Sequence, residues 1–420
     1  MGSFFEFSRQ VNAALMVIDE ITLQGRAEFH FMVNPAATGF VLPRMKTSDI
    51  LILGAGLSGL LTAHLLRQQR PDLRLRILEA RPEPGGRIRT LRPEAAAPLE
   101  MGATWLSPDH RRLQKLLTRL GIETIPQRMG SEAVYEFSPA QPPQRVQLPS
   151  GEPQSFRIKG GTDRIITALI SSLGEGELVC NAPPLAVRAV RDEQEGSTEA
   201  ASANSGATTK MLVETPDEGY AASVIISTLP PRLLTHSIIF DPPLPGTLHR
   251  IASQTHTWMS ESIKAGFSST HPRLFRQEDG AVTTLFSNAG PFTELYDHSS
   301  ERDHALIGFL HPGLSELTPE DREAAATKQL NRLLGTQAGD HGTYYECNWK
   351  QEAFTHSPHS GFIPPHQHNG HPVFRQPLLG GRLILSGTET ASVHPGYMEG
   401  AVASAEHAAE AAAAWFSSHG

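Results

Sequence analysis

The chain contains 420 residues, a length that suits two domains better than a single hydrophobic core. Hydrophobic residues make up 39% of it and charged residues 19%, which is the composition of a globular rather than a disordered protein. The formal net charge is −8 and no basic block occurs, which argues against nucleic acid as a partner, because phosphate binding requires a basic patch.

The chain has two cysteines, Cys180 and Cys347, too few for a disulfide framework, so a cytoplasmic location is expected. No uncharged apolar run reaches the length of about 18 residues that indicates a membrane span. Residues 1–46 show no clear helix or strand pattern and no convincing secretory signal. We expect them to form an N-terminal extension, either poorly ordered or added by a mis-set start.

The clearest pattern lies in residues 49–90, which predict a strand, a glycine turn, a helix and a second strand. The predicted elements are Ile50–Leu53, a helix from about Ser58 to Gln69, and Arg74–Leu78. A glycine turn between a strand and a helix is the arrangement that binds dinucleotides.

Gly54, Gly56 and Gly59 form the motif GxGxxG in this turn. The first glycine allows the tight turn, the second lets the backbone approach a pyrophosphate, and the third lets the helix pack on the strand. The pyrophosphate would lie at the positive end of the helix. Glu79, at the end of the second strand, would accept hydrogen bonds from a ribose and repel a 2′-phosphate. The ligand is therefore expected to be FAD or NAD, not NADP.

A second glycine motif follows directly, with Gly85 and Gly86 before Arg87. Backbone N–H groups and a guanidinium at one place suit a further contact with the diphosphate or its sugar.

Together these motifs resemble a known family. The stretches GAGLSG, EARPEPGGRIRT and LEMGATWL (residues 99–106) are similar to the N-terminal part of the flavin-containing amine oxidases, of which monoamine oxidase is the best-known member. Residues 383–412, LILSGTETASVHPGYMEGAVASAEHAAEAA, resemble that family's closing flavin-binding segment.

The resemblance implies an α/β flavoprotein with a Rossmann-like FAD-binding domain and a smaller mixed-sheet α+β substrate domain. The FAD-binding domain would comprise residues 47–106, 158–235 and 379–420, and the substrate domain residues 107–157 and 236–378. The residues that the resemblance places against FAD are Gly54, Gly56, Ser58, Gly59, Glu79, Ala80, Gly86, Arg87, Gly102, Ala103, Thr104, Trp105, Val187, Trp349, Gly387, Glu389 and Met398.

Between these blocks the chain departs from monoamine oxidase. Only about fifty residues separate Trp105 from Gly160, so most of the helical insertion that roofs the family's substrate cavity is missing. The pocket is expected to be more open, or closed by a second subunit in a homodimer. Residues 192–210, between two predicted hairpin strands, are polar and low in complexity.

Lys264 matches the family lysine that holds a water against flavin N5. A cation-bound water there can move protons or position oxygen during reoxidation. The alternation of Lys264 with Ile263 and Ala265 is also compatible with an exposed lysine at a strand edge.

Residues 347–366 resemble the family strand that carries the flavin attachment and one wall of an aromatic cage. Pro358 stands where monoamine oxidase has its flavin-bound cysteine, so FAD is expected to be held non-covalently. His359 stands at the first cage position and Tyr397 matches the second. The resemblance thus implies Lys264, Tyr397 and His359 as the catalytic set.

Five histidines within residues 356–371 raise the question of a metal site. No cysteine or acid accompanies them at ligand spacing, and a proline-rich loop is a poor cage, so we expect no metal.

The resemblance implies oxidation of a small-molecule amine. A hydride would pass from the carbon next to nitrogen to flavin N5, oxygen would reoxidise the flavin with release of hydrogen peroxide, and water would hydrolyse the imine to an aldehyde or ketone. Three alternatives remain: a flavin dehydrogenase or desaturase, a tailoring oxidoreductase of secondary metabolism, and a non-catalytic flavin-binding protein.

Overall fold

The computed structural model describes residues 45–94, 97–148, 155–191, 209–269, 282–300, 304–335 and 341–419. Residues 1–44 of the predicted extension and 192–208 of the predicted polar segment lie outside the described residues. Lys46 and Thr47 form the short strand β1, which pairs with β14 (Gly219–Ala222).

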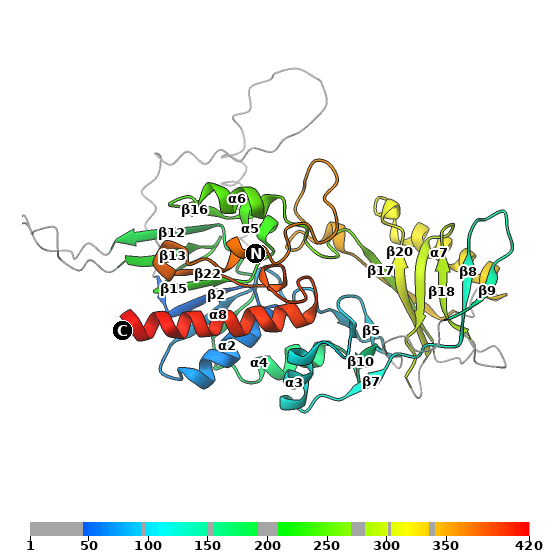
Figure 1. Ribbon diagram of the computed structural model, residues 1–420, viewed down its shortest axis with the longest axis horizontal. Coiled ribbons are helices and arrows are strands. Elements are labelled where there is room, and N and C mark those ends of the chain that lie inside the picture. The colour runs from blue at the N-terminus through cyan, green and yellow to red at the C-terminus, as the bar shows by residue number, and fades with distance from the viewer. Residues whose placement is uncertain are drawn as a thin grey trace, which may run out of the picture. The chain divides into compact units, whose positions relative to one another are not determined.

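A five-stranded parallel sheet forms the centre of the dinucleotide-binding part (Figure 1). In spatial order its strands are β11 (Leu178–Val179), β3 (Leu75–Leu78), β2 (Ile50–Leu53), β15 (Val224–Ser227) and β22 (Leu383–Leu385). Every neighbouring pair is parallel. The strand predicted at 50–53 is confirmed, and the second strand starts one residue later than predicted.

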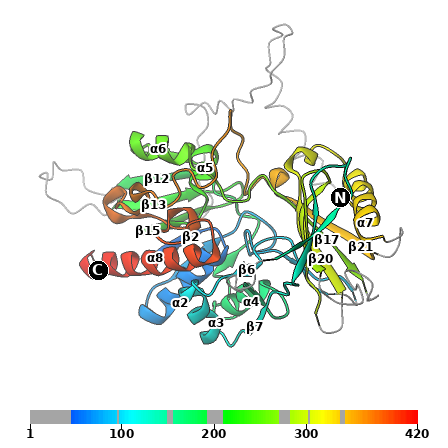
Figure 2. The ribbon, with the colours of Figure 1, turned by 45° about the vertical axis from the view of Figure 1, so that its right-hand side comes forward.

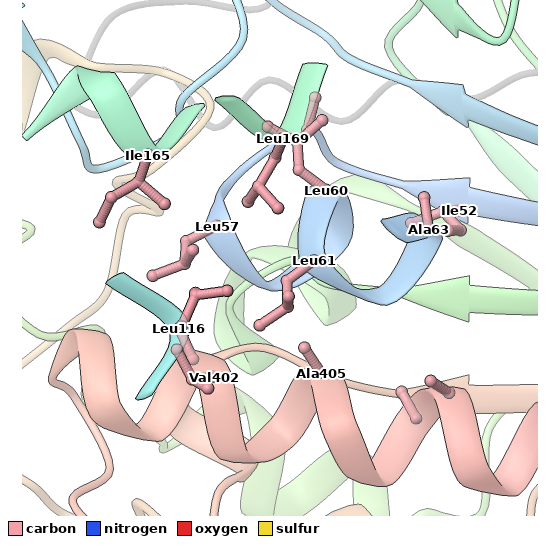
Figure 3. Packing of buried hydrophobic residues seen from close by; sticks show 14 of the residues in the cluster. Ile52, Leu57, Leu60, Leu61, Ala63, Leu116, Ile165, Leu169, Val402 and Ala405 are labelled. Atoms are coloured by element: carbon pink, nitrogen blue, oxygen red, sulfur yellow. The ribbon is translucent and has the colours of Figure 1, made fainter. Parts of the chain in front are cut away.

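Helices cover one face of this sheet. They are α2 (Leu57–Gln69), α3 (Arg111–Arg119), α4 (Asp163–Ile170) and α8 (Met398–His419). Because side chains alternate along a strand, Ile50 and Ile52 point to this layer and belong to one buried cluster with Leu60 of α2 and Val402 of α8. Figure 3 shows Ile52, Leu60 and Val402 within this cluster. This core therefore combines residues of α2, from the early part of the described chain, with residues of α8 near its C-terminus.

Leu51 and Leu53 point to the opposite face, where they pack against a second sheet. Its strands, in spatial order, are β1 (Lys46–Thr47), β14 (Gly219–Ala222), β13 (Thr209–Glu214), β12 (Ala186–Arg191) and β16 (Ile239–Asp241). Helices α5 (Pro231–Ser237) and α6 (Gly246–Ser253) contribute to the same core and lie beside β12 and β13 in both views (Figures 1 and 2).

A seven-stranded mixed sheet forms the other large layer. Its order is β21 (Thr343–Asn348), β17 (Ile263–Ser269), β20 (His304–Leu310), β19 (Phe292–Asp297), β18 (Val282–Ser287), β8 (Glu132–Glu136) and β9 (Gln144–Gln147). All pairs are antiparallel except β18 with β8.

Helix α7 (Pro319–Leu334) covers one face of this sheet with Ala326, Leu330 and Leu333. Thr318 caps it by accepting from the Asp321 N–H, and Gly335 ends it with φ of 67°. Part of the opposite face, at Ile307 and Cys347, packs in one buried cluster with Leu99.

Shorter elements connect these layers. The strands are β4 (Thr90–Leu91), β5 (Leu99–Glu100), β6 (Trp105–Leu106), β7 (Thr124–Pro126) and β10 (Phe156–Ile158). The 3-10 helices are η1 (Pro312–Leu314), η2 (Trp349–Gln351), η3 (Pro372–Arg375), η4 (Leu379–Gly381) and η5 (Thr388–Thr390).

The α/β fold class is confirmed, and the domain boundaries stay a prediction. Helix α3, within residues 107–157, contributes Leu113, Leu116 and Leu117 to the core against α2 and α8. Helix α6, within residues 236–378, packs on the second sheet of the dinucleotide-binding part. The spacing of apolar residues along a helix indicates which side chains are buried, but it does not indicate which sheet the helix packs against.

Candidate active site

A cavity of about 720 Å³ reaches from the glycine turn after β2 to the open face of the seven-stranded sheet. The structure brings most of the residues predicted to contact FAD into its wall. These are Gly54, Gly56, Ser58, Glu79, Ala80, Gly86, Arg87, Gly102, Ala103, Thr104, Trp105, Trp349, Gly387 and Met398.

The glycine turn has the geometry that a bound dinucleotide needs. Gly54 has φ of 99°, a conformation that L side chains rarely adopt. A Cβ on Gly59 would lie 2.0 Å from the Gly54 carbonyl oxygen, so only glycine lets α2 approach the turn this closely. The first residues of α2, Leu57 and Ser58, line the cavity. Because N–H groups at a helix N-terminus favour anions, this end of the cavity fits the diphosphate of FAD.

Glu79 follows β3 (Leu75–Leu78) at the same edge and is 5% exposed. Its carboxylate accepts hydrogen bonds from the N–H groups of Ala55 at 2.7 Å and Arg81 at 3.0 Å. These contacts hold the carboxylate at the cavity wall, where each oxygen has a further lone pair for a ribose hydroxyl.

The second glycine pair lies against the first turn. The Gly85 N–H donates to the Ala55 carbonyl at 2.9 Å, and a Cβ on Gly86 would lie 3.2 Å from the Gly56 Cα. Arg87 is thereby placed at the cavity wall, next to the glycine turn.

The C-terminal segment is tied to the glycine turn by buried hydroxyl groups. Ser58 Oγ lies 2.7 Å from Ser386 Oγ and 3.1 Å from Ser404 Oγ, and it accepts from the Gly387 N–H at 3.2 Å. This network brings the N-termini of α2 and α8 to one cavity. The start of α8, at Met398, suits negative charge on a flavin ring.

Lys264 reaches the cavity from β17 and is 2% exposed. Its Nζ donates to the Gly102 carbonyl at 2.6 Å and to Thr104 Oγ1. The ammonium lies 4.8 Å from the centre of the Trp105 ring and 5.4 Å from that of Phe309. Of the two interpretations open from the sequence, the structure excludes an exposed strand-edge lysine.

Burial lowers the pKa of Lys264 to about 7, while the charges of Glu100 and Cys347 act in the opposite direction. Glu100 is itself buried, and this burial raises its pKa although Thr90 and the Thr162 N–H donate hydrogen bonds to it. The lysine can therefore gain or lose its proton near neutral pH.

Tyr397 lines the cavity just before α8. Its ring stacks with His366 at a centroid distance of 6.0 Å and an interplanar angle of 20°. Trp258, also in the wall, lies 5.8 Å away and stacks on His366 at 4.2 Å. The flat surface beside Tyr397 is thus built from Trp258 and His366.

His359 is not brought there, contrary to the expectation that it faces Tyr397. It does not belong to the cavity lining, and its Nε2 lies 3.1 Å from Glu261 Oε1. Pro358 and both cysteines also lie outside the lining. The resemblance gives His359 a position along the chain. The path of the loop that follows η2 determines where its ring points.

Three further predicted residues lie behind the wall. Gly59 lies where α2 packs on the glycine turn. Val187 is buried in the core between the two sheets, and the residues just before its strand, Pro183, Pro184 and Leu185, line the cavity in its place. Glu389 is fully buried and contacts Arg87.

Several wall residues were not predicted. Trp258 lies on a loop before β17, and no pattern in a single sequence marks it. Thr293, Glu294 and Phe309 come from β19 and β20. Strand alternation could have identified candidates on the face of Lys264, but the pairing of the strands decides which of them lie beside it.

Nowhere in the described ranges do three or more His, Cys, Asp or Glu residues gather as a metal site would require. Within the same ranges, no helix is both long and apolar enough to cross a membrane.

Comparison with known proteins identifies the family. The model of the family described as flavin containing amine oxidoreductase matches residues 57–141 and 140–413. Amine oxidase [flavin-containing] B of Sus scrofa is 25% identical over 450 residues, which cover 86% of this chain and 85% of that protein. The corresponding human enzyme is 25% identical over 452 residues, with the same coverage.

Solved structures share the fold. A double mutant of putrescine oxidase superposes with a TM-score of 0.72 at 22% identity and covers 88% of this chain and 100% of its own. Cyclohexylamine oxidase from Brevibacterium oxydans has a TM-score of 0.72 at 18% identity, covering 88% and 99%. With the fit of the cavity to FAD, these matches lead to one conclusion: the chain belongs to the flavin-containing amine oxidase family and is an FAD-dependent oxidoreductase.

Proposed function

We propose that this chain is an amine oxidase that transfers a hydride from the carbon next to the substrate nitrogen to N5 of non-covalently bound FAD. Oxygen would be the electron acceptor, with hydrogen peroxide and an imine as products, and hydrolysis of the imine would give an aldehyde or ketone. The observation that carries the proposal is the buried Lys264 in the cavity that the glycine turn and the start of α8 also line.

FAD, when bound, supplies the two-electron chemistry, and the chain supplies position and charge. Lys264 holds a titratable proton at Nζ, fixed by the Gly102 carbonyl and the Thr104 hydroxyl. The rings of Trp105 and Phe309 lie beside the ammonium, at 4.8 and 5.4 Å from their centres. Because a positive Lys264 repels an ammonium, it favours the neutral amine, which is the form that can donate a hydride.

Tyr397 and Trp258 offer ring faces at the mouth of the same cavity. The electron-rich faces of aromatic rings attract cations, so these rings can guide an amine inward. Tyr397 is 41% exposed, which is consistent with a position at the entrance.

The test is anaerobic mixing of the FAD-loaded protein with a panel of amines, followed by admission of oxygen. Bleaching of the flavin absorbance, then recovery with one equivalent of peroxide, is the expected result. Two of the structural relatives are named for oxidation of alkyl amines, so the panel includes putrescine and cyclohexylamine.

The test also separates the alternatives. Bleaching without peroxide on admission of oxygen would favour a dehydrogenase or desaturase. A flavin that no compound of the panel reduces would favour a non-catalytic flavin-binding protein. Bleaching only by bulky amines or amides would favour a tailoring enzyme.

A further inference from the structure

A buried histidine lies against Tyr397 behind the cavity wall. His110, the residue before α3, is 6% exposed and does not belong to the cavity lining. Its ring centre lies 5.8 Å from that of Tyr397 and 5.1 Å from that of His394. Tyr397 therefore contacts a ring behind the wall, in addition to Trp258 and His366.

Two sets of hydrogen bonds fix the position of His110. The Ser107 N–H donates to His110 Nδ1 at 3.2 Å. Glu399, in the first turn of α8, is 3% exposed, and its carboxylate accepts from the N–H groups of Arg112 at 3.0 Å and Leu113 at 2.8 Å. These N–H groups lie in the first turn of α3, where a helix has no acceptor of its own for them. Glu399 therefore ties the start of α3, and His110 with it, to the start of α8.

The hydrogen bond from Ser107 requires the neutral form of His110. Because the Ser107 N–H donates to Nδ1, this nitrogen carries no proton, and Nε2 carries the N–H. Protonation of Nδ1 would remove the acceptor of a backbone N–H and place a positive charge beside Tyr397. A positive ring there would also oppose the attraction of the Tyr397 ring for a cation.

The surroundings of His110 favour this neutral form. Burial lowers the pKa of His110, and the charge of His394 lowers it further. The carboxylates of Glu399 and Asp109 have smaller effects in the opposite direction. His110 is therefore neutral at neutral pH and gains its charge below about pH 6.5, the ordinary pKa of a histidine.

We propose that neutral His110 is a positioning residue, which holds the ring of Tyr397 in the orientation that binds a cationic substrate, and that protonation of His110 loosens this ring. The inference rests on the proposed amine oxidation and deepens it, because it assigns a residue that acts through Tyr397 without touching the substrate. Binding of a cation at Tyr397 is then strongest above the pKa of His110 and weakens as the pH falls through it.

The experiment measures binding of butyltrimethylammonium to the FAD-loaded protein by titration calorimetry between about pH 5 and 8. This cation keeps its charge at every pH and has no N–H group, so its binding reports on the protein even if no amine reduces the flavin. The comparison is with His110→Phe, which keeps a ring that cannot be protonated. Lys264 and the other titrating groups of the cavity are present in both proteins, so the ratio of the two dissociation constants removes their contribution.

The two proteins should bind the cation within about twofold of each other at the alkaline end. At the acidic end the parent should bind it about three- to tenfold more weakly than His110→Phe. A ratio that does not change with pH, or a parent that does not bind the cation at any pH, would overturn the inference. Peroxide formation with the amine panel tests the proposed oxidation separately.

His394→Asn gives an independent check of the titrating group. Asparagine tolerates the positive φ of 43° at this position, and the substitution removes a charge that lowers the pKa of His110. The loss of binding should therefore occur at a higher pH than in the parent. A loss at an unchanged pH would assign the titration to another group and overturn the role of His110 protonation.

A double-mutant cycle separates positioning from a general loss of structure. At about pH 8, His110→Ala should weaken binding of the cation about fivefold, and by less than about twofold when Tyr397 is already replaced by alanine. The control is His249→Ala, an exposed residue on α6, which should bind like the parent. Equal effects of His110→Ala in both backgrounds would show that His110 does not act through Tyr397.

Discussion

The guanidinium of Arg87 donates to both carboxylate oxygens of Glu389, at 2.5 and 2.9 Å, across 302 residues of sequence. Glu389 is fully buried and also accepts from the Trp258 N–H at 3.3 Å. The pair therefore joins the segment after the second glycine motif to the segment before α8, and Arg87 also lines the cavity. A fully buried carboxylate depends on such a partner, because its desolvation is otherwise uncompensated.

Replacement of Arg87 by leucine should lower the free energy of unfolding by about 3 kcal/mol or more, since it leaves the Glu389 charge buried and unpaired. Urea unfolding followed by circular dichroism measures this. The control is Lys159→Met, which breaks a pair whose side chains are 57% and 70% exposed and should cost less than about 1 kcal/mol. Equal losses in both variants would contradict the role of the pair.

Gly59→Ala should abolish or strongly reduce FAD binding, because the new Cβ would lie 2.0 Å from the Gly54 carbonyl oxygen and push α2 away from the turn. The FAD content of the purified protein and its melting temperature measure the effect. Gly246→Ala, at the first residue of α6, is the matched control because nothing lies within 4 Å of a Cβ there. Retention of FAD by Gly59→Ala would show that the turn can open without loss of its ligand.

Lys264→Met should slow reoxidation of the reduced flavin by oxygen and leave FAD bound. Because the pKa of Lys264 is lowered to about 7, its positive charge is present below this pH and is lost as the pH rises through it. The reoxidation rate constant of the parent should therefore fall with rising pH around 7, and that of Lys264→Met should be low and independent of pH. Stopped-flow measurements between pH 6 and about 9 would decide this. A titration near pH 7 that survives in Lys264→Met would assign it to another group.

Tyr397→Ala should slow reduction of the flavin by a good amine substrate, about fivefold to tenfold, because one ring of the stacked wall is lost. Tyr397→Phe keeps the ring and should stay within about twofold of the parent. Anaerobic stopped-flow reduction gives both values. A Phe variant as slow as the Ala variant would point to the hydroxyl group and not to the ring face.

The dinucleotide-binding half of the site could be predicted from the sequence because its signals are local. The glycine spacing, the apolar strand before it and Glu79 after β3 all lie within about thirty residues, and short-range geometry determines how such residues meet. The predicted strand 50–53 agrees with the structure for the same reason.

The arrangement of side chains in the substrate part of the site could not be predicted in the same way. It depends on contacts between segments that are far apart in the chain, which no local sequence pattern indicates. His359 occupies the expected position along the chain, yet its ring contacts Glu261, and Trp258 and His366 stand beside Tyr397. Glu294 reaches the face of Lys264 through the register of β17, β20 and β19.

The sequence by itself indicated an adenine dinucleotide as the ligand, because the glycine motif and Glu79 are residue types at short spacing, and its resemblance to the flavin-containing amine oxidases pointed to FAD. Only the tertiary structure decided which side chains share the cavity with Lys264, that this lysine is buried enough for its pKa to fall to about 7, and that Glu294 lies further along the same face. Burial and strand register are properties of the assembled sheet, since each arises from contacts between residues that are far apart in the chain.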